Sequence, residues 1–263
     1  MDLPEPTRRF LFTVQYLGTN YAGWQTQTNA VGVQQVIEGS LERMFGMSIR
    51  IEGSGRTDAG VHALAQRAHA DLPTSIEPHG LVLGLNDLLP SDIRVSSADI
   101  VPHDFHARFD ACGKTYRYRI WNTPASDVFR AATHAHVRQP LDSAAMQNAA
   151  APLLGHHDFK SFTVAVPSVS STWRTIEDIT VERYGRVILI TVSADGFLRF
   201  MVRRIVGSLI EAGRGGTDAK AVAACLEPDY GLARWTAPAA GLTLLSVRYN
   251  RLKNGELRMD NSE

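Results

Sequence analysis

With 44% hydrophobic and 21% charged residues, a chain of 263 residues has the composition of a folded globular protein, which excludes a disordered or fibrous one. Basic and acidic side chains are balanced at 27 each, so the molecule has no overall attraction for a polyanion, and nucleic acid would bind only at local basic patches. The two cysteines lack zinc-site spacing, and no apolar run has the length of a signal-peptide core or a membrane span, so we expect a cytoplasmic protein with free thiols.

The first half of the chain alternates between strand and helix patterns. Residues 62–72 are ambiguous between strand and helix. Taken as a strand, they complete the order β-α-β-β-α-β, which is that of a ferredoxin-like split βαβ unit. The other predicted elements are strands at 8–16, 48–53 and 92–101 and helices at 31–45 and 77–89.

The second half nearly repeats this order, although no sequence repeat is visible. We therefore expect an α+β protein of two ferredoxin-like lobes, residues 1–107 and 108–263, whose sheets join side by side around a central cleft. Residues 155–162 are expected to end a helix and form a turn. The predicted elements of this half are a strand at 114–121, helices at 141–155 and 196–213, two strands within 173–194 and a last strand at 242–249.

Two basic clusters lie close to aromatic residues and are candidates for anion binding, although a solvated charged face explains each equally well. On a helix with about 100° per residue, Arg203 lies at the edge of the apolar stripe, whereas Arg204 points toward solvent. An arginine at such an edge can bury its stem and place its guanidinium in a cleft. The clusters are Arg108, Lys114, Arg117 and Arg119, and Arg199, Arg203, Arg204 and Arg214.

Residues 53–63, GSGRTDAGVHA, place Asp58 among small residues, with Arg56 two positions before it. The glycines permit a sharp turn and the close approach of a ligand. A simpler interpretation is that Thr57 or Asp58 caps a helix that begins at Ala59. A cap requires neither the arginine nor small residues on both sides, so the stretch indicates a site whose acidic group is Asp58.

Residues 55–63 resemble the signature of the TruA-type tRNA pseudouridine synthases. The similarity continues in the family's order over nearly the whole chain, apart from its two ends. The resemblance implies the conversion of uridine to pseudouridine, an isomerisation for which we expect no cofactor. The further motifs are Tyr21–Gln25, Phe105–Phe109, Tyr116–Tyr118, Gly155–Phe159, Met201–Gly207 and Thr236–Pro238.

The resemblance also implies a role for four residues. Asp58 attacks C1′ or removes the C2′ proton, and both routes require an ionised carboxylate, for which Arg203 is the implied charge partner. Tyr116 and Tyr118 share one face of a strand, and periodicity does not separate them. The resemblance assigns Tyr116 as the ring that stacks on uracil and takes part in C5 proton transfer. It assigns Arg56 to the extrusion of the target nucleotide.

The implied substrate is tRNA, modified at uridines 38, 39 and 40 of the anticodon arm, and the implied assembly is a homodimer whose combined groove supplies the positive charge that the monomer lacks. Two other functions stay open. One is a non-catalytic RNA-binding module with the same two lobes. The other is a metal-assisted hydrolase that uses His134 with His136, or His156 with His157. These pairs have no cysteine or carboxylate companions at zinc-site spacing, so we expect no metal.

Overall fold

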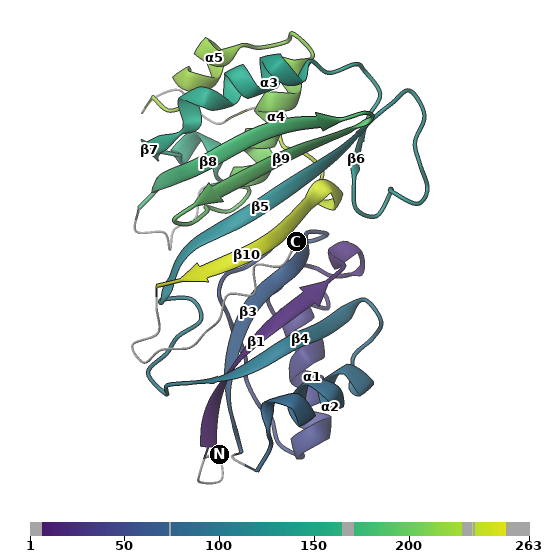
Figure 1. Ribbon diagram of the computed structural model, residues 1–263, viewed down its shortest axis with the longest axis vertical. Coiled ribbons are helices and arrows are strands. Elements are labelled where there is room, and N and C mark those ends of the chain that lie inside the picture. Colours follow the sequence, from purple (N-terminus) through teal and green to yellow (C-terminus); the bar gives the residue numbers. More distant parts are fainter. Residues whose placement is uncertain (1–6, 74, 165–170, 228–232, 234, 251–263) are drawn as a thin grey trace.

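The computed structural model describes residues 7–73, 75–164, 171–227, 233 and 235–250 (Figure 1). Its first half follows the predicted order, and residues 62–72 belong to a strand. The elements are β1 (Thr7–Tyr16), α1 (Val33–Phe45), β2 (Glu52–Gly53), β3 (His62–Pro73), α2 (Pro78–Leu88) and β4 (Ile93–Val101). A short 3-10 helix, η1 (Gly18–Asn20), follows β1.

The second half has the same order of main elements, with short insertions. Its main elements are β5 (Ala111–Asn122), α3 (Ser143–Ala150), β8 (Trp173–Tyr184), β9 (Val187–Ala194), α4 (Met201–Gly213) and β10 (Leu242–Tyr249). The insertions are β6 (Ala135–Val137), η2 (Ala151–Leu153), β7 (Gly155–Asp158), η3 (Lys160–Phe162), α5 (Ala219–Ala224) and η4 (Ala239–Gly241).

All the strands belong to one sheet, in the order β4-β1-β3-β10-β5-β9-β8-β7, with β2 on β3 and β6 on β5. Each half therefore has the ferredoxin-like strand order, and the predicted α+β class is confirmed. The halves meet where β3 and β10 run side by side in the middle of the sheet (Figure 1). Their parallel pairing joins His62 to Thr243 and Ala63 to Leu244. Because His62 and Ala63 end the GSGRTDAGVHA stretch, this join places Asp58 at the boundary of the two halves.

The core follows from the periodicity of each element. Helix α1 buries Val33, Ile37 and Leu41 at intervals of four residues, and it ends at Gly46, whose φ of 71° is left-handed. One large hydrophobic cluster includes buried residues from both halves. The segment 102–110, which connects β4 to β5, covers a second, smaller cluster of Leu11, Val101, Phe105 and Ala107. The lobe boundary at 107/108 stays a prediction.

Two sequence predictions about element boundaries are wrong. Residues 155–158 do not end a helix but form β7, because their backbone pairs with the edge of β8. Helix α4 begins at Met201 rather than at residue 196, because Phe200 has a left-handed φ of 63° that interrupts the helix. Among the described residues, none of the helices has the length and hydrophobicity that crossing a bilayer requires.

Candidate active site

Asp58 lies in the loop between β2 and β3, and its side chain does not cap a helix. The backbone N–H of Val61 donates to the Asp58 carbonyl at 3.1 Å, which closes a tight turn directly before β3. The helix-cap interpretation is therefore wrong. The Asp58 carboxylate instead accepts a hydrogen bond from Nη1 of Arg203, with 3.3 Å between Nη1 and Oδ2.

The catalytic-loop candidate, residues 53–63, is held by the segment that follows β1. The N–H of Trp24 donates to the Thr57 carbonyl at 3.3 Å, and the N–H of Gly60 donates to the Tyr21 carbonyl at 3.2 Å. Gly23 permits this approach, because a Cβ there would lie 2.3 Å from the Thr57 carbonyl oxygen. The buried hydroxyl groups of Tyr16 and Thr57 are also hydrogen-bonded, at 3.0 Å. These contacts fix the backbone on both sides of Asp58.

Burial and charge act in opposite directions on Asp58. Burial raises the pKa of its carboxyl group, while the charge of Arg203, the hydrogen bond from Arg203 and the charge of Arg199 lower it. The net effect is a pKa above the ordinary value. The Asp58 and Arg203 side chains are 19% and 16% exposed, so the ion pair is largely shielded from solvent.

Arg203 is oriented by a segment that precedes β10. Its Nε donates to the carbonyl of Ala237 at 2.8 Å, and the N–H of Ala237 donates back to the Arg203 carbonyl at 2.9 Å. The hydroxyl of Tyr118 donates to the carbonyl of Pro238 at 2.8 Å. Tyr118, which the sequence left as a packing residue, therefore also fastens the segment that holds Arg203.

His62 closes this arrangement from the catalytic-loop side. The N–H of Gly18 donates to its Nδ1 at 3.0 Å, so the proton is on Nε2, which lies 3.0 Å from the carbonyl of Ala240. Burial lowers the pKa of His62 and favours this neutral form. His62 thus links the loop of Asp58 to the segment that orients Arg203.

Tyr116 lies on the same side of β5 as Tyr118 and is 8% exposed. Its ring meets Phe197 edge to face, with 5.1 Å between centroids. Burial raises its pKa, and electrostatic interaction with Tyr16 and Asp58 raises it further, so the hydroxyl is protonated at neutral pH. The structure therefore brings Tyr116, Asp58 and Arg203 into one region, whereas Arg56 is an exposed residue of the same loop as Asp58.

The basic cluster of Arg108, Lys114, Arg117 and Arg119 is divided, with its β5 members on both faces of that strand. Lys114 donates from Nζ to the Ser54 carbonyl at 2.8 Å, whereas Arg119 bonds Thr243 from the opposite face of β5. Burial, together with the charges of Arg108 and Arg174, lowers the pKa of Lys114 to about 8. This contact was not predicted from the sequence, although Lys114 and Tyr116 alternate onto the same face of β5.

Arg204 does not point to solvent, so that prediction is wrong. Its Nη1 donates to the carbonyls of Ser161 and Thr163 at 3.3 and 3.0 Å, and burial lowers its pKa. The segment after β7 packs over this side of α4, which periodicity within one helix does not reveal. Arg203 and Arg204 are therefore both partly buried, but only Arg203 meets a carboxylate among the described residues.

The histidine pairs make other contacts. His136 Nε2 lies 2.8 Å from the Thr123 carbonyl, and His157 Nε2 lies 2.7 Å from that of Leu154. His156 Nδ1 lies 3.0 Å from the hydroxyl of Thr175. Within the described ranges, no group of three or more histidine, cysteine, aspartate or glutamate side chains has the arrangement of a metal site.

Comparison with known proteins assigns this fold and site to a class. Residues 12–110 and 149–250 match the family model of the tRNA pseudouridine synthases, and the chain belongs to this family. It is an isomerase that converts uridine to pseudouridine in tRNA.

Two relatives match nearly the full length. The chain is 44% identical over 243 residues to tRNA pseudouridine synthase A of Pelobacter propionicus, which covers 92% of this chain and 100% of that protein. It is 45% identical over 252 residues to tRNA pseudouridine synthase A of Halalkalibacterium halodurans, with 95% of each chain covered. A crystal structure of a Cbf5–Nop10–Gar1 complex has 12% identity and a TM-score of 0.39, with 90% of this chain and 49% of that chain covered.

Proposed function

We propose that the chain modifies uridines 38, 39 and 40 in the anticodon arm of tRNA, with Asp58 as the group that acts on the ribose. The observation that carries this proposal is the contact of the Asp58 carboxylate with Arg203, at 3.3 Å, with the buried Tyr116 close enough for the charge of Asp58 to raise its pKa. An ionised carboxylate is required both for attack at C1′ and for removal of the C2′ proton. The charge of Arg203 favours this ionised form against the effect of burial.

Tyr116 is proposed as the surface on which the detached uracil stacks. Its phenol ring is fixed by the edge-to-face contact with Phe197. Its raised pKa disfavours a phenolate, so its hydroxyl takes part in removing the C5 proton only as a neutral relay, which releases its own proton as it accepts another. Its protonated hydroxyl and its ring are therefore both available to the base.

Arg56 is proposed to assist the extrusion of the target nucleotide. A stacked base is out of reach of a protein carboxylate. The nucleotide therefore has to leave the stack, at a cost of about 2–4 kcal/mol. Arg56 is exposed and lies two residues before Asp58, where its guanidinium can fill the vacated space or hold the displaced phosphate.

The proposed assembly is a cytoplasmic homodimer of chains whose two lobes are residues 1–107 and 108–263. The formal net charge of each chain is zero, so a groove formed by two chains supplies the local positive charge that tRNA binding needs. Sedimentation of the protein with and without tRNA measures this stoichiometry. A monomer that carries full activity at nanomolar concentration would contradict the dimer.

The variant Asp58→Ala tests the catalytic assignment. In tRNA labelled with tritium at uridine C5, isomerisation releases the label to water, and we expect the variant to reduce the rate by at least about a hundredfold. We expect its Kd for tRNA to stay within about twofold, because the carboxylate repels rather than attracts phosphate. Unchanged tritium release would refute the assignment, and full inhibition by a chelator would instead support a metal-assisted reaction.

A further inference from the structure

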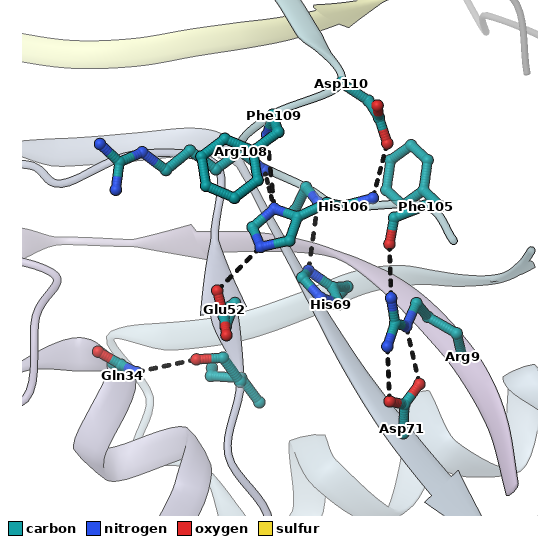
Figure 2. Close-up of polar contacts among 12 residues, drawn as sticks. Arg9, Gln34, Glu52, His69, Asp71, Phe105, His106, Arg108, Phe109 and Asp110 are labelled. Atoms are coloured by element: carbon teal, nitrogen blue, oxygen red, sulfur yellow. Dashed lines mark hydrogen bonds and ion pairs between the residues drawn. The ribbon is translucent and has the colours of Figure 1, made fainter. Parts of the chain in front are cut away.

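The connection between β4 and β5 carries an exposed aromatic ring next to a basic side chain. Phe109 is 73% exposed. The guanidinium carbon of Arg108 lies 5.7 Å from the centroid of the Phe109 ring, and the His106 ring centroid lies 4.2 Å from it. Figure 2 shows these three side chains grouped together. Single exposed aromatic residues are common on protein surfaces, so exposure alone does not define a site.

Hydrogen bonds within the turn hold the backbone at Phe109. Nδ1 of His106 accepts from the N–H groups of Arg108 and Phe109, at 3.1 and 3.4 Å. The N–H of His106 donates to the Asp110 carboxylate at 2.6 Å, and the N–H of Asp110 donates back to the His106 carbonyl at 3.1 Å. Since the backbone of the turn has little conformational freedom left to lose, stacking of a ligand on the ring costs little ordering of the turn.

The turn is also fastened to the sheet beneath it (Figure 2). Arg9 on β1 forms two hydrogen bonds with the Asp71 carboxylate, at 2.7 and 2.8 Å, and a third with the Phe105 carbonyl, at 2.9 Å. The N–H of Ala107 donates to Nδ1 of His69 at 3.2 Å. Residues on both sides of His106 are thus anchored, which distinguishes this turn from an unrestrained surface loop.

The same turn adjoins the loop that carries Asp58. Nε2 of His106 lies 3.1 Å from a carboxylate oxygen of Glu52, six residues before Asp58 in the sequence. Lys114 bonds the Ser54 carbonyl, and the charge of Arg108 is one cause of its lowered pKa, so these cations are neighbours. Basic side chains next to an exposed aromatic ring are the combination that binds unpaired nucleotides, since the cations meet phosphates and the ring meets a base.

We propose that Phe109 is a stacking site for an unpaired tRNA base near the target uridine, with Arg108 meeting an adjacent phosphate. The occupant follows from the proposed function, on which this inference rests, and from the guanidinium of Arg108 beside the exposed ring. The His106 ring contacts the Phe109 ring on one side. The exposed surface of the Phe109 ring receives the base. Stacking of this kind tolerates any base, because each base has a π face.

Substitutions of Phe109 test the stacking. We expect Phe109→Ala and Phe109→Leu to raise the Kd for tRNA about tenfold, which corresponds to about 1.4 kcal/mol, and Phe109→Trp to keep the affinity of the unaltered protein. The rate at saturating tRNA should stay within about twofold, because the ring does not touch the reacting atoms. The control is Tyr184→Ala, which removes another exposed aromatic ring, at the end of β8, and should leave the Kd unchanged.

The salt dependence separates stacking from charge. Phe109→Ala should leave the slope of log Kd against log salt concentration unchanged, whereas Arg108→Ala should reduce that slope by about one unit. A reduced slope in Phe109→Ala would contradict a stacking role and would assign the effect to a displaced cation.

An abasic scan of the anticodon arm identifies the base. At the nucleotide that stacks on Phe109, loss of the base should weaken binding to the unaltered protein about tenfold and should weaken binding to Phe109→Ala no further. If every abasic position affects both proteins equally, the stacking proposal is overturned.

Failure of this proposal and failure of the proposed function give different results. If the unaltered protein releases no tritium from labelled tRNA, the proposed function fails. If it is active while Phe109→Ala and Phe109→Leu bind tRNA with unchanged Kd, only the stacking site fails. A change in sedimentation of Phe109→Ala with unchanged tRNA affinity would assign the ring to a contact between protein chains, and would also overturn the proposal.

Discussion

Asp58 and Arg203 are 145 residues apart in the sequence, yet their side chains meet at 3.3 Å across the boundary between the two halves of the sheet. Arg203 reaches this position because its Nε is fixed on the Ala237 carbonyl, which leaves Nη1 for the carboxylate. The loop that carries Asp58 and the segment that orients Arg203 are themselves connected through His62. The ion pair is therefore held from both sides by backbone contacts.

Removal of the Arg203 charge should shift the pH dependence of the reaction. Arg203 lowers the pKa of Asp58 by charge and by a hydrogen bond, so Arg203→Met should raise that pKa and move the acidic limb of the kcat/KM profile to higher pH. Arg204→Met is the matched control, since Arg204 bonds the carbonyls of Ser161 and Thr163 instead. Its profile should keep the same midpoint, and an equal shift in both variants would contradict the pairing.

Asp58→Asn should change stability in a direction that depends on pH. The pKa of Asp58 is raised in the folded protein, so the folded state holds its proton more tightly than the unfolded chain does. The stability from this group is present below the unfolded pKa and is lost as pH rises through the folded pKa. The difference in unfolding temperature, variant minus unaltered protein, should therefore be more positive at pH 7 than at pH 4. Calorimetry at the two pH values measures it. A gain confined to low pH would contradict the raised pKa.

His62→Ala should reduce the rate without a matching loss of tRNA affinity. The variant loses the bonds to Gly18 and Ala240, so the Asp58 loop and the Arg203 segment are no longer linked, and we expect a fall in kcat of at least about tenfold with Kd within about twofold. His79→Ala, which changes an exposed histidine on α2, is the control. A proportional change in kcat and Kd would indicate general loss of structure instead.

Protonation of His62 should also destabilise the fold in acid. Burial lowers its folded pKa, so the unfolded chain binds the proton more readily, and stability falls as pH decreases from about 6.5 through the folded pKa. The imidazolium has no lone pair on Nδ1 to accept the Gly18 N–H. The slope of unfolding free energy against pH in this range should be smaller in His62→Ala; an unchanged slope would exclude this histidine as its source.

Gly23→Ala should be strongly destabilising. Gly23 has a φ of 93°, and a Cβ there would lie 2.3 Å from the carbonyl oxygen of Thr57, so we expect a loss of about 2–4 kcal/mol of unfolding free energy. Gly39→Ala in α1 is the control, for which we expect the opposite change in stability, because no atom lies within 4 Å of the added Cβ. That variant should be stabilised by about 0.5–1 kcal/mol. Denaturant unfolding measures both, and equal effects would contradict the close packing at Gly23.

The local pattern of the sequence determined most of the elements. The periodicity of α1 and of β5 is visible in short windows, because each side chain's burial depends on the face it shares with its near neighbours. The duplicated order of strands and helices was sufficient to predict the α+β class. The family signature around Asp58 identified the chemistry, as the family match confirms.

Only the tertiary structure decided which distant groups meet. The contact of Lys114 with Ser54, the burial of Arg204 and the strand β7 all depend on segments that are remote in sequence. The same is true of Tyr118 and Pro238, whose hydrogen bond supports the position of Arg203. Periodicity describes one element at a time, whereas hydrogen bonds and desolvation depend on whatever else packs against it. For that reason the sequence indicated the candidate site residues, and the fold determined what holds them in place.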